Sequence, residues 1–136
     1  MSSLIFLNEC SSTNEKILHF LPVENNGLLS VYTFNQTKGK GQYGNSWKSS
    51  ENLNLAFSIA VPVSLIQLPT HLLNFHTALT VAQFFAIMTN VTTEIKWPND
   101  LIIKNKKVAG LLIEKKKIGE ISYYIFGIGI NVLQNI

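Results

Sequence analysis

The stretch TKGKGQYGNSW at residues 37–47 combines glycines and lysines in a way that could bind an anion. Its glycines, Gly39, Gly41 and Gly44, have the spacing of a dinucleotide-binding fingerprint, and glycine lets backbone N–H groups approach a phosphate or carboxylate closely. A Rossmann loop also needs a helix directly after the third glycine, whereas residues 45–50 lead into another apolar stretch. The pattern therefore predicts a backbone cradle for an anion outside a Rossmann fold, with an unliganded surface turn as the alternative.

All eleven basic residues are lysines, so an anion must be recognised by lysine, backbone N–H groups or neutral polar side chains. Lys107, with two other lysines nearby, fits an exposed turn when its residue type is considered alone. Asp100, the only aspartate, could hold a hard cation or simply form the turn in which it lies. The residue types alone leave both alternatives open for Asp100.

The composition is that of one folded domain, with 136 residues, of which 46% are hydrophobic and 14% charged. A net charge of +3 is too small to predict nucleic-acid binding. No apolar run reaches the about 18 residues of a membrane helix, and the N-terminus does not resemble a signal peptide. We therefore expect a cytoplasmic protein without a membrane partner. The single cysteine, Cys10, is expected to pack in the core rather than to catalyse.

Apolar periodicity and turn residues predict the order β-α-β, long loop, β-α-β-β-β. A helix is expected to begin at Ser12, with Glu15 completing a capping box, and to end near Phe20. A second helix, residues 72–88, is apolar on most sides and is therefore expected to be mostly buried. The predicted strands are residues 4–7, 28–35, 53–62, 92–97, 101–103, 108–114 and 121–132, with turns at 104–107 and 115–119 and an unstructured loop at 36–52. This order predicts an α+β fold with a mixed, mainly antiparallel sheet and helices packed on one face.

Five short motifs, taken together and in this order, resemble the catalytic domain of biotin protein ligases. They are Ser12-Thr13-Asn14, the glycine loop from Gln36 to Trp47, Lys96-Trp97-Pro98-Asn99-Asp100, Lys107-x-x-Gly110 with Glu114, and Gly127-Ile128-Gly129-Ile130-Asn131-Val132. The resemblance covers residues 4 to 132 and implies a fold of the class II synthetase and biotin ligase type. Lipoate ligases share the fold class but not this pairing of the glycine loop with the Lys-Trp-Pro-Asn-Asp motif.

The resemblance implies an enzyme, a biotin–[biotin carboxyl carrier protein] ligase that works in two steps. Biotin and ATP, with Mg²⁺, would first give biotinyl-5′-AMP and pyrophosphate. The biotinyl group would then pass to a lysine of a biotin carboxyl carrier protein of a biotin-dependent carboxylase. Two alternatives stay open: a catalytically weak module that binds biotin or biotinyl-AMP, and a lipoate or octanoyl transferase relative.

The resemblance also implies roles for residues of this sequence. Lys107 and Lys40 are the expected catalytic residues, and Asp100 is the expected magnesium ligand. Lys40 stands where the family has an arginine and would supply its charge with one ammonium instead of a guanidinium fork. Gln42 stands where the family has a second arginine, so a positive charge that would help to retain the reactive adenylate is missing there. The expected biotin-binding residues are Ser12, Thr13, Asn14, Gln36, Gly39, Lys40, Gly41, Gln42, Lys107 and Gly110. The expected nucleotide-binding residues are Lys40, Trp47, Asn99, Asp100 and Asn131.

Residues 1–136 are expected to form one biotin ligase-like catalytic domain that stops early at its C-terminus. Neither the N-terminal DNA-binding domain nor the C-terminal β-domain of some relatives is expected. An apolar surface left uncovered in this way would favour a homodimer. The glycine loop is expected to be mobile when empty and to become ordered over biotin.

Overall fold

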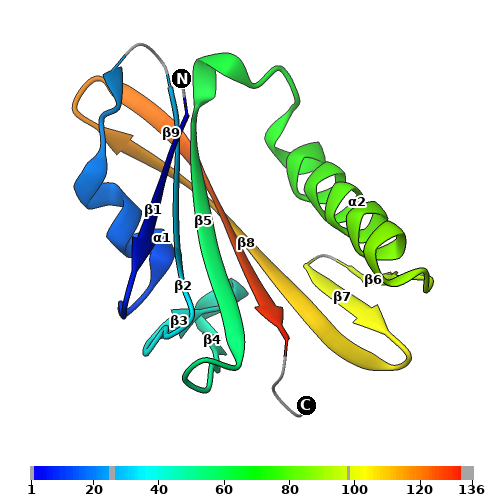
Figure 1. The fold of residues 1–136 in the computed structure, drawn as a ribbon. Coiled ribbons are helices and arrows are strands. Elements are labelled where there is room, and N and C mark those ends of the chain that lie inside the picture. Colours follow the sequence, from blue (N-terminus) through cyan, green and yellow to red (C-terminus); the bar gives the residue numbers. More distant parts are fainter. Residues whose placement is uncertain (1, 25–26, 98, 133–136) are drawn as a thin grey trace.

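A seven-stranded sheet runs through the molecule and carries both helices (Figure 1). The computed structural model describes residues 2–24, 27–97 and 99–132. In spatial order the strands are β1 (Ser2–Leu7), β2 (Leu28–Thr33), β5 (Asn54–Pro62), β9 (Ile121–Asn131), β8 (Lys106–Ile118), β7 (Asp100–Ile103) and β6 (Glu94–Lys96). Of these neighbours, β1 and β2 pair in parallel and all the others are antiparallel. The predicted mixed, mainly antiparallel sheet is therefore confirmed.

The first helical segment connects the parallel strands β1 and β2, which need a crossover between them. It consists of α1 (Thr13–Lys16) and a 3-10 turn, η1 (Ile17–Phe20), and so ends where the sequence predicts. Ser12 has the extended backbone of an N-cap residue, but its side chain makes no capping hydrogen bond. The predicted capping box is wrong, because Glu15 forms an ion pair with Lys40 of the glycine loop instead.

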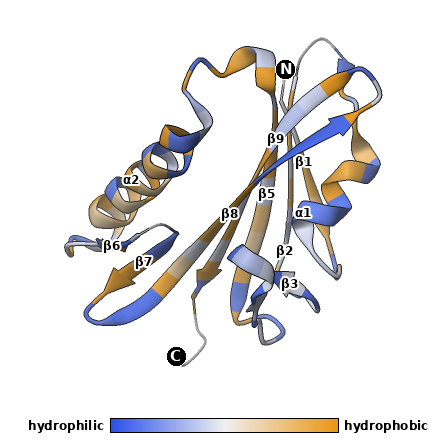
Figure 2. Cartoon of the chain, turned by 180° about the vertical axis from the view of Figure 1, so that it is seen from behind, coloured by the Kyte–Doolittle hydropathy of each residue, from blue (hydrophilic) through white to orange (hydrophobic). Residues whose placement is uncertain are grey.

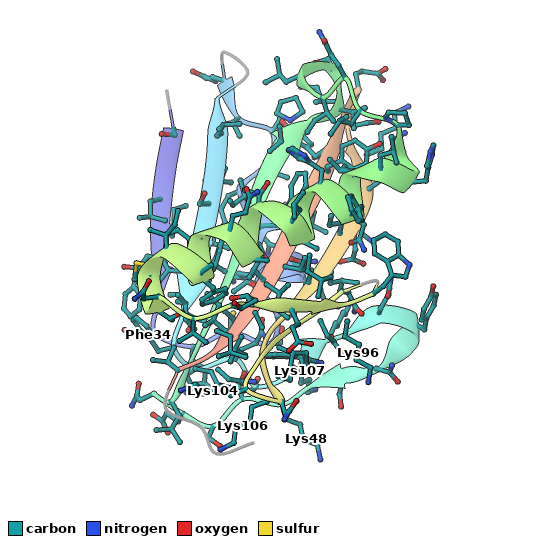
Figure 3. The ribbon with its side chains drawn as sticks, turned by 90° about the vertical axis from the view of Figure 1, so that its right-hand side faces the viewer. Phe34, Lys48, Lys96, Lys104, Lys106 and Lys107 are labelled. Atoms are coloured by element: carbon teal, nitrogen blue, oxygen red, sulfur yellow. The ribbon has the colours of Figure 1, made fainter. Side chains whose placement is uncertain are left out.

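The two helices lie on opposite faces of the sheet, and not on one face as the sequence analysis predicts. Successive side chains of a strand point to opposite faces. In β9, Tyr123 and Ile125 pack with Ile17 of η1, whereas Ile128 packs with α2 (Thr70–Thr89). Figure 3 accordingly shows α2 in front of the sheet. Because β5 and β9 have apolar residues on both faces, their sequence pattern does not reveal where each helix packs.

The helix α2 is much more exposed than the sequence analysis predicts, although Figure 2 shows hydrophobic residues along much of it. Its buried residues are Leu73, Ala78 and Ala82, whereas Phe84 and Ile87 are 55% and 83% exposed. Contrary to the expectation from the sequence, α2 is long and apolar enough to cross a membrane, and the apolar window is 17% buried. One such helix is weak evidence for a membrane span, because core helices of soluble proteins have the same composition.

The hairpin of β8 and β9 is longer than predicted. The lysines at 115–117 lie within β8, where they pair with residues 122–124 of β9, and not in the predicted turn. The chain reverses at Gly119, whose φ of +60° is a backbone conformation that glycine adopts without strain. A run of charges thus proves to be compatible with a strand at the sheet surface, because its side chains alternate between the two faces.

The glycine-rich loop has secondary structure of its own, which the sequence analysis does not predict. The strands β3 (Gly39–Lys40) and β4 (Ser46–Trp47) form an antiparallel hairpin around a 3-10 turn, η3 (Gln42–Gly44). A further 3-10 turn, η4 (Val63–Leu65), follows β5. The glycine hairpin, residues 39–47, therefore has a regular structure that can hold its side chains against the sheet.

Candidate active site

A cavity of about 270 Å³ lies on the face of the sheet that carries α1. Its walls come from α1, the glycine hairpin and the strands β5, β7, β8 and β9. The predicted site residues that line it are Ser12, Thr13, Asn14, Gln36, Lys40, Gly41, Gln42, Trp47, Asn99, Asp100, Lys107 and Gly110. Gly39 and Asn131 were also predicted to belong to the site, but they do not line the cavity. Motifs that are far apart in the sequence thus meet around one space.

Two glycines of β9, Gly127 and Gly129, also line the cavity; they belong to the last of the five motifs but were not predicted as site residues. A Cβ atom on Gly129 would lie 2.5 Å from the ring of Trp47, and one on Gly110 would lie 2.8 Å from it. Trp47 therefore packs where only glycines leave room. Glycine within a strand often marks such a close approach, and this signal could have identified both residues. The other lining residues that were not predicted are Tyr43, Asn45, Ser46, Ala56, Leu111, Leu112 and Ile128.

One end of the cavity is polar and uncharged. The backbone N–H of Thr13 donates to Gln36 Oε1 at 2.9 Å, and both residues are buried. Gln36 is itself placed by a β-bridge to Cys10. Burial raises the pKa of the Cys10 thiol, and Cys10 does not line the cavity. The predicted packing role of Cys10 is confirmed. The groups that line this end of the cavity are the neutral ones of Thr13 and Gln36.

A β-bulge turns Lys107 toward the cavity. Two adjacent residues of β7 lie opposite Ala109 and Lys107, so that Val108 between them has no partner. In a regular strand Lys107 would share a face with Ala109, which packs under α2. The bulge reverses the alternation, and Lys107 instead lines the cavity together with Gly110.

Lys107 carries its charge next to one carboxylate and one aromatic ring. Its Nζ lies 3.0 Å from Asp100 Oδ1 and 4.9 Å from the centroid of the Trp47 ring. The Lys107 and Asp100 side chains are 37% and 22% exposed, so water screens the pair and it contributes little to stability. The main effect is local, because a positive and a negative group are held together at one wall of the cavity.

Further lysines surround this wall. Figure 3 shows Lys48, Lys96, Lys104 and Lys106 at the same end of the molecule as Lys107. Lys96 pairs in register with Asp100, Lys104 lies in the turn between β7 and β8, and Lys106 begins β8. All four are exposed and none lines the cavity. An anionic ligand that approaches this end therefore meets a positive surface before it reaches Lys107.

An ion pair between Lys40 and Glu15 ties the glycine hairpin to α1. The hydrogen bond to Glu15 raises the pKa of the Lys40 ammonium, against a smaller opposing effect of burial. Lys40 therefore stays charged at neutral pH. Its side chain and that of Glu15 are 43% and 49% exposed, so the pair is screened and can be broken at low cost.

We expect the Glu15→Gln substitution to loosen the glycine hairpin. Trypsin should cut after Lys40 up to about fivefold faster than in the wild type, which corresponds to the about 1 kcal/mol limit for an exposed ion pair. Limited proteolysis followed by mass spectrometry measures the rate, and Glu9→Gln, at another exposed glutamate, is the matched control. Added salt should accelerate cleavage of the wild type more than that of Glu15→Gln. Equal cleavage rates at low salt would contradict the role of this ion pair.

The family to which the chain belongs follows from comparison with known proteins. Residues 7–131 match the model of the biotin/lipoate A/B protein ligase family. The chain belongs to this family. The resemblance to biotin protein ligases noted in the sequence is thereby confirmed, and so is the fold that it implies. The roles of individual residues of this family member stay predictions.

Individual relatives agree with the family match. The bifunctional ligase/repressor BirA of Bacillus spizizenii is 34% identical over 134 residues, which cover 96% of this chain and 41% of BirA. BirA of Bacillus subtilis is 31% identical over 137 residues, covering 98% of this chain and 42% of that protein. The structure of the biotin protein ligase from Aquifex aeolicus in complex with biotin and ATP superposes with a TM-score of 0.79 at 31% identity, covering 98% of this chain and 53% of that one. The chain thus spans about half, or less, of the length of these relatives.

Proposed function

We propose that this chain activates biotin with ATP to biotinyl-5′-AMP and transfers the biotinyl group to a lysine of a biotin carboxyl carrier protein. The observation that carries the proposal is one cavity with a neutral polar end, at Thr13 and Gln36, and a charged wall, at Lys107 and Asp100. Biotin has a neutral ureido ring and a carboxylate tail, which need these two kinds of surface. The biotin and ATP bound to the Aquifex aeolicus relative support the same ligands here.

In the first proposed step, an oxygen of the biotin carboxylate attacks the α-phosphorus of ATP. The new O–P bond forms as the bond to pyrophosphate breaks, so the electron pair leaves with the pyrophosphate. Both reactants are anions, and their repulsion adds to the barrier unless positive charge is placed between them. Lys107 supplies that charge from the cavity wall, and Lys40 adds a second charge from the glycine hairpin.

In the second proposed step, the neutral amine of the carrier lysine attacks the biotinyl carbonyl carbon. An amide bond forms, AMP leaves with the electron pair of the anhydride bond, and the amine proton passes to solvent. Until then the adenylate must be shielded from water, which is the proposed task of the glycine hairpin with Gly41 and Gln42. Ser12 and Asn14 complete the ureido end, and Trp47 and Asn99 are proposed to contact the nucleotide.

Asp100 is the proposed ligand of a Mg²⁺ ion that arrives with ATP. Such an ion takes one or two carboxylates from the protein and completes its shell with phosphate oxygens and water. Among the described residues that line the cavity, Asp100 carries the only carboxylate. The described part of the chain has no group of three or more His, Cys, Asp or Glu residues that could hold a metal by itself. The residues therefore fit a nucleotide-borne ion, which would offset phosphate charge.

We propose a cytoplasmic location, as expected from the sequence, because the proposed reaction consumes ATP. A homodimer is proposed as well. The exposed apolar residues of α2, such as Phe84 and Ile87, form a surface that association of two copies would cover.

The deciding experiment measures pyrophosphate release with biotin, ATP and Mg²⁺, followed by mass spectrometry of an isolated carrier domain. Pyrophosphate release together with a biotinylated carrier lysine supports the proposal. Biotin binding in a calorimeter without pyrophosphate release would instead indicate a binding module. Turnover of lipoate or octanoate in place of biotin would indicate an acyl transferase of the same family.

Asn131 acts in this proposal through the backbone of Lys107. Its Nδ2 donates to the Lys107 carbonyl oxygen at 3.0 Å, at the edge of the bulge. We expect Asn131→Ala to lower kcat for pyrophosphate release about tenfold, the worth of one hydrogen bond that keeps Lys107 in place. The Kd of biotin from calorimetry should change less than about twofold, because the ureido end is untouched. A parallel loss of biotin affinity would mean that Asn131 contacts the ligand or supports the whole cavity.

A further inference from the structure

A row of hydrogen-bonded side chains runs behind the polar end of the cavity. Ser58 Oγ, on β5, lies 2.5 Å from Asn14 Oδ1 and 2.8 Å from Thr13 Oγ1. On its other side, Asn14 Nδ2 donates to Glu114 Oε1 at 3.0 Å and to the carbonyl oxygen of Leu112 at 3.3 Å. Ser58 is 0% exposed, and neither Ser58 nor Glu114 lines the cavity.

The protons in this row can point in one direction only. The Glu114 carboxylate accepts and cannot donate, so it receives a proton of the Asn14 amide nitrogen. The Asn14 oxygen also only accepts, and it therefore takes the single hydroxyl proton of Ser58. Ser58 then has no proton left for Thr13. The Thr13 hydroxyl donates to Ser58 Oγ at 2.8 Å in preference to Gln36 Oε1, which lies 3.4 Å away and already accepts from the Thr13 backbone N–H. The carboxylate at one end thus sets the orientation of every group up to Thr13.

Two acceptors beside the Asn14 amide keep the row from reversing. A Cβ atom on Gly127 would collide with the Asn14 amide, so this side chain lies directly against β9. A flipped Asn14 would turn its oxygen toward two acceptors, Glu114 and the Leu112 carbonyl, and would leave buried groups without partners. Asn14 is 5% exposed and cannot exchange these partners for water.

We propose that Ser58 and Glu114 are positioning residues that make the Thr13 hydroxyl a hydrogen-bond acceptor toward the cavity. With its own proton committed to Ser58, Thr13 Oγ1 offers a lone pair to a ligand and would leave a ligand oxygen unpaired. The chemical class selected is a ligand with an N–H at this point. This inference rests on the proposed function, in which that N–H belongs to the ureido ring of biotin.

The test compares biotin with two analogues in which one or the other ureido N–H is replaced by a ring oxygen. Calorimetry gives the ratio of the analogue Kd to the biotin Kd for each protein. We expect the wild type to disfavour one analogue by about tenfold or more, because the Thr13 oxygen then faces another acceptor. In Ser58→Ala the Thr13 hydroxyl keeps only the long 3.4 Å contact with Gln36 Oε1, which it can exchange for a ligand acceptor, so this ratio should fall to about two or below.

A further variant keeps the test independent of folding defects. Glu114→Gln retains the shape but can also donate, so Asn14 is no longer held in one orientation, and the ratio should fall as well. Because each ratio compares two ligands on the same protein, an unfolded fraction cancels from it.

The outcomes separate this inference from the function on which it rests. A wild-type preference for biotin that is lost in Ser58→Ala and Glu114→Gln supports the positioning role. Biotin binding with the same ratio in all three proteins would overturn that role and leave the proposed function intact. A wild type that binds neither biotin nor the analogues would overturn both.

Discussion

Replacing Lys107 with alanine is expected to lower pyrophosphate release by about 100-fold to 1,000-fold, the usual effect of removing one group that stabilises developing charge. Lys107 is the lysine that the bulge at Val108 turns into the cavity, and it is held there by Asp100. Without its ammonium, the biotin carboxylate and the α-phosphate would approach each other with their repulsion much less offset. The effect should appear mainly in kcat, because the ureido end of the cavity binds biotin through other groups.

Lys106→Ala is the matched control for this measurement. Lys106 is the neighbouring residue, is exposed and does not line the cavity. Pyrophosphate release by this variant should stay within about threefold of the wild type, since an exposed charge is screened by water and salt. Similar losses in the two variants would show that only the general positive charge of the turn matters, and would contradict a catalytic role for Lys107.

Placing a methyl group at Gly129 is expected to weaken biotin binding by about 100-fold. A Cβ atom there would lie 2.5 Å from the Trp47 ring, so the ring must leave the space between the glycine hairpin and β9. Displacing a well-packed side chain typically costs about 1–3 kcal/mol, and here the displaced ring also takes a wall of the cavity with it. Gly129→Ala should therefore keep the sheet but lose the cavity wall that Trp47 forms.

Tryptophan fluorescence and calorimetry together check this expectation. The measurement uses a Trp97→Phe background, because Trp97 is 56% exposed and would add its own emission. Trp47 emission should shift to longer wavelength in Gly129→Ala as the ring becomes hydrated. Ser122→Ala, on the same strand and away from the cavity lining, should change neither the emission nor the Kd of biotin. Unchanged emission in Gly129→Ala would show that the hairpin accommodates the methyl group.

The opposite placement of the two helices explains why one face of the sheet holds the site. The helix α2 covers the face on which Leu111 and Ile128 pack. The other face is left to α1 and the glycine hairpin, whose short elements cover it incompletely and leave the cavity between them. A site formed in this way depends on small residues in the strands beneath it, as the contact of Trp47 with Gly110 and Gly129 illustrates.

Much of the fold could be predicted from the sequence because its signals are local. The strand expected at residues 53–62 is β5, Asn54–Pro62, and the helix expected at 72–88 is α2, Thr70–Thr89. Apolar runs and turn residues depend only on neighbours in the chain. The motifs around Gln36, Asp100 and Lys107 could be recognised for the same reason, and the structure brings all three residues to one cavity.

The remaining features were decided by contacts between segments far apart in the chain. The bulge at Val108, which aims Lys107, is visible only in the pairing of β7 with β8. Glu15 pairs with Lys40 instead of capping its own helix, because the tertiary fold brings the glycine hairpin beside α1. Ser58 reads in the sequence as an ordinary residue of an apolar strand, and only the approach of Asn14 makes it part of the site. Local sequence patterns are enough to predict most of the elements and the side chains that they carry. The face, neighbours and hydrogen-bond partners of each side chain follow from packing, which is non-local.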